Sequence, residues 1–99
     1  MYLINITIKA DQVPEDQQAE LLAKHRTWFK QEFAAGNFLL VGPYRDRSMA
    51  GLVIAQATSR EQVEALVDKD AYYPAMANYE INEFQANLIS DQVNDFKGA

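Results

Sequence analysis

The sequence has 99 residues, a formal net charge of −5 and no cysteine. The missing cysteine excludes disulfides, thiolate metal sites and a cysteine nucleophile. The negative charge disfavours nucleic acids and anionic membranes as partners, because both need a basic surface to neutralise their phosphates. A chain of this length folds as one domain. We therefore expect a single domain over residues 1–99, with its core within about 2–88 and a polar tail over 90–99.

The first ten residues, MYLINITIKA, alternate in polarity and lack a basic region followed by a continuous apolar stretch. They therefore do not resemble a signal peptide. No apolar run approaches the roughly 20 residues that a membrane-spanning helix requires. We expect a cytoplasmic protein that has no membrane partner.

Residues 2–8, YLINITI, place apolar side chains at every second position, which predicts a half-buried strand. After a polar connection, Pro14 suits the first turn of a helix. We expect this helix to run to about Ala35, with Gly36 as its stop. Its apolar residues share one sector of the helical wheel, as in an amphipathic helix: Leu21, Leu22, Trp28, Phe29 and Phe33.

The middle of the chain predicts a β-hairpin. Residues 38–41 form a short apolar strand that ends in Gly42-Pro43, and residues 51–57 have the pattern of the returning strand. The loop between them contains Arg45 and Arg47, so the tip of the hairpin is basic.

A second helix and a last strand complete the pattern. Ser59 and Gln62 match a capping box, so the helix is expected to begin there and to close with residues 68–70. Residues 79–88 alternate loosely and predict the last strand. The order β-α-β-β-α-β is that of a ferredoxin-like α+β fold, with an antiparallel four-stranded sheet and both helices on one face. Apolar residues on both faces of this sheet favour a homodimer.

His25 is the only histidine, and it lies in the middle of the apolar sector of the first helix. An imidazole in that position loses hydration and needs a hydrogen-bond partner. It is either a general acid and base or a core histidine satisfied by a carbonyl or carboxylate, and the spacing leaves both readings open. Asp70 is expected at the end of the second helix, where composition alone favours a solvated charge.

Other side chains suit the recognition of a small planar or anionic ligand. Tyrosines can wall a pocket for a planar ligand, and a guanidinium suits carboxylates and other oxyanions. The alternatives are core or interface packing for the aromatic residues and an exposed hairpin tip for the arginines. The expected substrate contacts are Tyr2, Trp28, Tyr44, Arg45 and Tyr72, and the remaining tyrosines Tyr73 and Tyr79 are candidates for the same wall.

No metal or organic cofactor is expected. One histidine cannot build the usual zinc or copper site. The chain also has no glycine-rich phosphate loop and no Gly-x-Ser-x-Gly elbow.

The order and spacing of these features resemble the YCII-like family over about residues 2–86. The matching positions are His25 in the first helix, Gly36 at its end, the strand into Gly42-Pro43, Ser59 at the start of the second helix and Asp70 at its end. The resemblance implies a ferredoxin-like fold in a dimeric α/β-barrel assembly, with a dyad of His25 and Asp70 in a pocket. The family's aspartate commonly opens an Asp-Pro-aromatic motif, which here is Asp70-Ala71-Tyr72.

The enzymatic example in that family is a dehydrochlorinase that acts on a chlorinated hydroxyhydroquinone in aromatic degradation. The resemblance therefore implies a cofactor-free lyase for a small aromatic or quinone-like substrate. His25 would take and return a proton near neutral pH, and Asp70 would orient its ring. The alternatives are a non-catalytic dimer that binds a small molecule or acts as an accessory protein, and an isomerase or small monooxygenase of the same barrel class.

Overall fold

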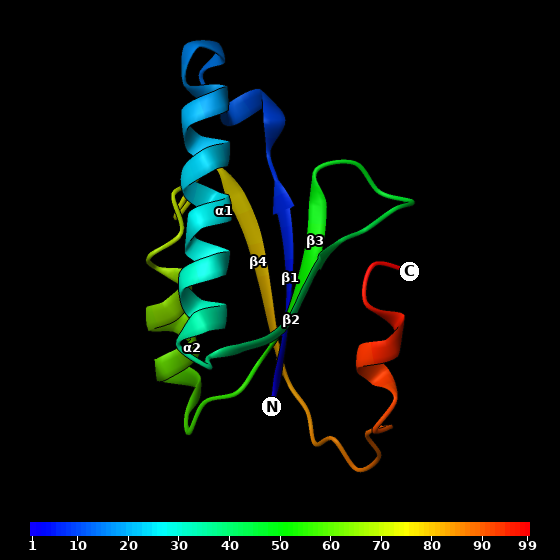
Figure 1. Ribbon diagram of the computed structural model, residues 1–99. Coiled ribbons are helices and arrows are strands. Elements are labelled where there is room, and N and C mark those ends of the chain that lie inside the picture. The colour runs from blue at the N-terminus through cyan, green and yellow to red at the C-terminus, as the bar shows by residue number, and fades with distance from the viewer.

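The computed structural model describes residues 1–99 and has the predicted ferredoxin-like α+β fold. Four antiparallel strands form one sheet in the order β2-β3-β1-β4. Figure 1 shows both helices on the same face of this sheet. The strands are β1 (Tyr2–Ile8), β2 (Phe38–Pro43), β3 (Ala50–Ala55) and β4 (Ala77–Glu83), and the helices are α1 (Gln18–Ala34) and α2 (Arg60–Val67).

Local sequence signals explain where the helices begin and end. A 3₁₀ turn over Glu15–Gln17 follows Pro14, so α1 begins only at Gln18, after this turn and not at the proline. Gly36 has a φ of 82°, which only glycine adopts at little cost, and it ends α1 as predicted. Ser59 accepts a hydrogen bond from the backbone N–H of Gln62 at 3.2 Å, which confirms the predicted cap of α2.

Three predicted boundaries differ from the structure. The returning strand β3 covers Ala50–Ala55 and ends two residues before its predicted end. Helix α2 ends at Val67, so Asp70 lies in the turn that follows the helix and not on the helix itself. Strand β4 begins at Ala77 and ends at Glu83, five residues before Leu88. The loose alternation beyond Glu83 misled the prediction, because no strand is available to pair with that segment.

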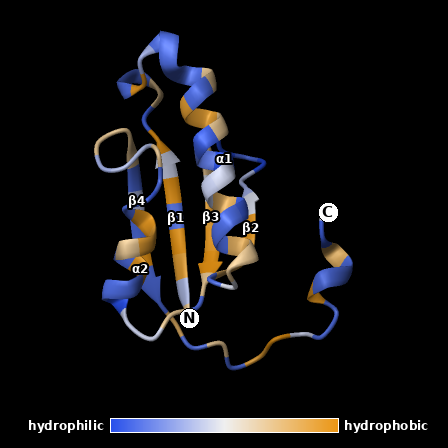
Figure 2. Cartoon of the chain, turned by 60° about the vertical axis from the view of Figure 1, so that its left-hand side comes forward, coloured by the Kyte–Doolittle hydropathy of each residue, from blue (hydrophilic) through white to orange (hydrophobic).

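The core lies between the helices and one face of the sheet. Tyr2, Ile4 and Ile6 of β1 point to this side and are at most 3% exposed. The antiparallel register aligns Ile4 with Val53 of β3, which is fully buried. Trp28 of α1 belongs to the same buried cluster and covers this face of the sheet from the helix side. Figure 2 shows the alternation along β1 as bands of apolar and polar colour.

The other face of the sheet carries no helix. Because side chains alternate along a strand, Leu3 and Asn5 of β1 and their partners Ile54 and Leu52 of β3 point to this side. All four are half-buried, and we call this surface the open face. Its apolar residues lie on β1, on β3 and on the edge strand β2, where Leu40 pairs with Ile54.

Beyond β4 the chain leaves the sheet. The backbone N–H of Phe84 donates to the carbonyl of Met1 at 2.9 Å, and the hydrogen bonds after that point are local to the segment. Figure 1 shows this segment on the side of the sheet opposite the helices. Residues 90–99 were predicted to be polar, yet Val93 and Phe96 of this stretch are exposed apolar side chains, as are Leu88 and Ile89 just before it.

No helix of the structure combines the length and the apolar character that are required to cross a membrane.

Candidate active site

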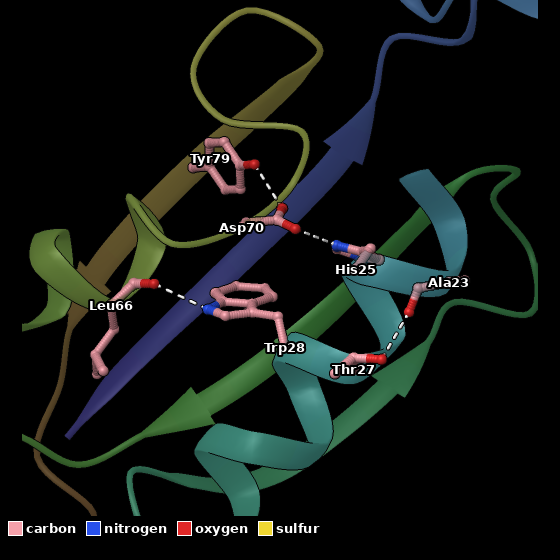
Figure 3. A network of polar contacts seen from close by, with 7 residues as sticks. All are labelled: Ala23, His25, Thr27, Trp28, Leu66, Asp70 and Tyr79. Atoms are coloured by element: carbon pink, nitrogen blue, oxygen red, sulfur yellow. Dashed lines mark hydrogen bonds and ion pairs between the residues drawn. The ribbon is translucent and has the colours of Figure 1, made fainter. Parts of the chain in front are cut away.

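The structure brings His25 and Asp70 into direct contact, although 45 positions separate them in the sequence. Nδ1 of His25 lies 2.6 Å from Oδ1 of Asp70, as Figure 3 shows. The histidine is 6% exposed and the aspartate 4% exposed, so the pair is largely removed from water. At such burial a charged carboxylate needs partners, and the imidazole supplies one of them.

The turn after α2 fixes the position of Asp70. Its backbone N–H donates to the carbonyl of Val67 at 3.0 Å, and its own carbonyl accepts from Tyr73 at 3.1 Å. These bonds direct the carboxylate back under α1. The turn places the acid beyond the carbonyl end of α2, and the two side-chain donors compensate for a charge that is unfavourable near that end.

Tyr79 supplies the second donor to Asp70. Its register partner is Ile6, so its side chain points to the helix-covered side of the sheet. Its hydroxyl donates to Oδ2 of Asp70 at 2.6 Å, which gives each carboxylate oxygen a donor of its own. Burial, together with the hydrogen bond to Asp70, raises the pKa of Tyr79 far above that of a free tyrosine. The phenol therefore remains a neutral donor.

This role of Tyr79 was missed from the sequence, where the residue was only one of five tyrosines considered for a pocket wall. The alternation of side chains along the last strand indicated that Tyr79 points toward the helices. No local pattern linked it to Asp70, because the turn between them decides the contact.

Aromatic rings surround the imidazole and hold it in place. The ring centroid of Phe29 lies 4.4 Å from that of His25, and those of Tyr72 and Trp28 lie at 5.0 and 5.7 Å. The indole N–H of Trp28 donates to the carbonyl of Leu66 at 3.0 Å, which anchors α1 to α2 beside the pair. Burial raises the pKa of the Tyr72 phenol, and the charge of Asp70 adds to this effect.

Nε2 is the nitrogen of His25 that remains available for a ligand. Every side-chain nitrogen or oxygen that is fully buried has a hydrogen-bond partner. Nε2 has no partner within the chain, so it is not fully buried and borders accessible space. If Nδ1–H donates to the carboxylate, Nε2 carries a lone pair and can accept a proton.

His25 forms part of the wall of a cavity of about 410 Å³ between α1, β1 and the β2–β3 hairpin. This volume is within the range of sites for small ligands. Most of its wall is apolar, with Ile6 and Ile8 of β1 and Phe29 of α1. Arg26 of α1 and Arg47 of the hairpin loop add the two positive charges. Such a cavity suits a small, partly anionic molecule with an apolar ring.

The five expected substrate contacts have different positions. Tyr44 is the one that borders the cavity, and its hydroxyl donates to Asn5 on the open face. Trp28 and Tyr72 pack against the His25 ring but do not line the cavity. Tyr2 is buried at the far end of β1, with its hydroxyl 3.5 Å from Glu83.

Arg45 does not line the cavity, whereas Arg47 does. The guanidinium of Arg47 lies 5.2 Å from the centroid of the Tyr44 ring, within the range of a cation–π contact. The sequence identified Arg45 and Arg47 on the hairpin, and the shape of the loop places only Arg47 at the wall of the cavity. No group of three or more His, Cys, Asp or Glu side chains converges in a way that would hold a metal ion.

The protein is of the α+β class and has a ferredoxin-like fold. Its candidate site joins a histidine of the first helix to an aspartate in the turn after the second. The model of the YCII-related domain matches residues 1–85, and the chain belongs to this family. No curated protein matches the sequence significantly.

A solved structure similar to this chain is that of a 5-chloro-2-hydroxyhydroquinone dehydrochlorinase from Burkholderia phenoliruptrix AC1100, in complex with 2,5-dihydroxybenzoquinone. The two share 15% sequence identity with a TM-score of 0.61. The match covers 86% of this chain and 94% of the other. At this identity the similarity establishes a common fold.

Proposed function

We propose that this protein is a cofactor-free lyase, similar to a dehydrochlorinase, that acts on a small aromatic or quinone-like compound. The observation that carries the proposal is the chain of hydrogen bonds from Tyr79 through Asp70 to His25, which ends at the wall of an apolar cavity. The dehydrochlorinase with the same fold binds a quinone, which supports this substrate class.

In the proposed reaction His25 moves protons between oxygen and carbon of a chlorinated hydroxyhydroquinone. Nε2 takes a proton from a ring hydroxyl and returns it to the carbon that carries chlorine. Loss of a second hydroxyl proton then forms a C=O bond, and chloride leaves with the electrons of the C–Cl bond. The sum is the loss of HCl to give a hydroxyquinone, and no oxidant or reductant is consumed.

Asp70 has the supporting role in this mechanism. Its bond to Nδ1 selects the tautomer with a free lone pair on Nε2, and its charge stabilises the imidazolium after proton transfer. Tyr79 fixes the other carboxylate oxygen, so the acid cannot rotate away from the histidine. General acid–base catalysis of this kind contributes about 10²–10⁴-fold to a rate.

The two arginines of the cavity suit the proposed substrate. A polyhydroxylated ring or a hydroxyquinone has several oxygens that carry partial or full negative charge. Arg26 and Arg47 present guanidinium groups near the site where these oxygens would lie. The apolar wall would cover the two faces of the ring.

The proposal includes a homodimer in a dimeric α/β-barrel arrangement. Leu3, Leu52 and Ile54 leave an apolar strip on the open face, and a second copy that packs against it would remove this strip from water.

The decisive test is chloride release from 5-chloro-2-hydroxyhydroquinone, followed with a chloride electrode, together with binding of 2,5-dihydroxybenzoquinone measured by calorimetry. Turnover that depends on His25 supports the lyase. Quinone binding without turnover of this compound or of related lactones would instead identify a non-catalytic binding protein. Lactone isomerisation, or a Soret band after incubation with haem, would favour the isomerase or the monooxygenase.

A further inference from the structure

The segment after β4 has the features of a docking arm. We define the arm as residues 85–99. Its hydrogen bonds are all internal, such as Val93 N–H to the carbonyl of Ser90 at 3.2 Å and Asp95 N–H to that of Gln92 at 2.9 Å. Figures 1 and 2 show it apart from the helices and the sheet. A segment that makes no hydrogen bond to its own domain is held to that domain only weakly.

The arm contains one amphipathic turn. Val93–Phe96 forms a 3₁₀ helix, and side chains three positions apart in such a helix lie on the same side. Val93 is 53% exposed and Phe96 is 70% exposed, so two apolar side chains share one side of the turn in contact with water. Asp91 and Asp95 supply negative charge beside them and outnumber the one positive side chain of the arm, Lys97.

A second surface has the complementary features. A groove of about 370 Å³ runs between α1 and β2 and is lined by Arg26, Phe29, Lys30, Phe33 and Val41. Its helix residues recur at intervals of three and four, so they form one continuous face of α1. Phe33 is 59% exposed, which is unusual for a residue of the apolar sector of this helix. The groove is therefore apolar along its floor and positively charged at its rim.

We propose that the arm of one copy of this chain binds in the α1–β2 groove of a second copy. In this arrangement Val93 and Phe96 cover the exposed ring of Phe33, and Asp95 lies near Lys30. The apolar contact supplies the affinity, and the opposite charges set the orientation of the arm.

The positions of the two surfaces favour a second copy over the arm's own domain. The groove lies on the helix-covered side of the sheet, at the edge formed by β2. The arm departs from β4, at the opposite edge, and lies on the open side of the sheet. The sheet of a single copy therefore separates its arm from its groove.

Docking would also complete the site of the second copy. The groove and the His25 cavity share Arg26, Phe29 and Val41 in their walls. An arm seated in the groove would support Phe29, which packs against the imidazole, and would close the cavity on the side of α1. This inference depends on the two surfaces and not on the proposed chemistry.

The test uses the absence of native cysteine. Ala34→Cys places a thiol at the end of the groove, and Asn94→Cys places one in the arm. Both positions are exposed. The two single variants carry different tags, are mixed and are oxidised, so a mixed disulfide can form only between copies. Ala65→Cys, at an exposed position of α2, replaces Ala34→Cys in the matched control.

We expect about tenfold more mixed disulfide from the groove pair than from the control pair, because docking raises the effective concentration of the two thiols. Lys30→Glu or Asp95→Lys should lower this yield, and their combination should restore it. Phe96→Ser should lower it at any salt concentration.

Equal yields from the groove and control pairs would overturn the proposal. A chain carrying both cysteines that forms only an intrachain disulfide would also overturn it, because the arm would then bind its own groove. The readout is independent of turnover, so an inactive protein with a docked arm would contradict only the proposed function.

Discussion

Tyr79 binds the oxygen of Asp70 that His25 leaves free. The phenol oxygen lies 2.6 Å from Oδ2, and the imidazole Nδ1 lies 2.6 Å from Oδ1. Both bonds are charge-assisted when the carboxylate is ionised, so each is stronger than a bond between neutral groups. The strand β4 thus takes part in orienting a histidine on α1, with the aspartate as the link.

The first prediction concerns His25. His25→Gln should lower the rate of chloride release by about 10²–10⁴-fold, because an amide keeps a hydrogen bond but cannot transfer a proton at neutral pH. The variant should remain folded, as monitored by circular dichroism. Lys24→Gln is the matched control, since Lys24 is the exposed neighbour on the same helix. A His25→Gln protein that is destabilised but fully active per folded molecule would reduce this histidine to a structural residue.

The second prediction concerns Asp70. Asp70→Asn retains the shape but has only one side-chain acceptor, so Nδ1–H of His25 and the hydroxyl of Tyr79 can no longer both have an acceptor. We expect a loss of about 1–3 kcal/mol in the free energy of unfolding, the typical penalty for a buried donor left without an acceptor. The rate should fall as well, because the imidazolium loses its counter-charge.

Urea unfolding and the chloride assay measure the two effects of Asp70→Asn separately. Asp68→Asn, an exposed acid in the same turn, should change neither quantity appreciably. A variant with normal stability and a normal rate would show that the carboxylate has no part in the site.

The third prediction is a pH dependence that originates from Tyr79. Burial and the hydrogen bond to Asp70 hold its pKa above the ordinary value of 10.0. Above that pH the unfolded chain loses the phenol proton while the folded chain keeps it, so stability falls as the pH rises. Tyr79→Phe removes this contribution. The free energy of unfolding of the variant should therefore decline less steeply above pH 10, by up to about 1.4 kcal/mol per pH unit.

The comparison requires urea unfolding of both proteins at several pH values between about 9 and 11, a range that brackets the ordinary tyrosine pKa. The raised pKa values of Tyr2, Tyr72 and Tyr73 affect both proteins alike, so the difference in slope isolates Tyr79. Parallel curves would mean that Tyr79 ionises equally in the folded and unfolded chains.

The fourth prediction concerns the open face. If a second copy covers it, light scattering at micromolar concentration should give twice the mass of the chain. Ile54→Glu places a charge in the middle of the apolar strip and should shift the protein to a monomer. Ala65→Glu, on the exposed side of α2, should leave the dimer intact. A wild-type monomer at these concentrations would contradict the dimer.

Much of the fold was readable from the sequence, because the signals that set it are local. The alternation of YLINITI predicts β1, and the positive φ of Gly36 ends α1 where the glycine indicated. The bond from Gln62 N–H to Ser59 places the start of α2. The end of β4 was not readable in this way, because a strand ends where its pairing with a neighbour ends, and the last register pair of β4 with β1 is Glu83 with Tyr2.

The sequence by itself singled out one residue of the candidate site, His25. One histidine on an apolar helix face must find a partner for its ring nitrogen, and this requirement follows from the cost of burying an unpaired polar group. Only the tertiary structure decided the partners. The turn after α2 brings Asp70 beneath α1, strand pairing aims Tyr79 at the same carboxylate, and the hairpin loop turns Arg47 rather than Arg45 toward the cavity. These contacts join residues far apart in the chain, and no local periodicity encodes such distances.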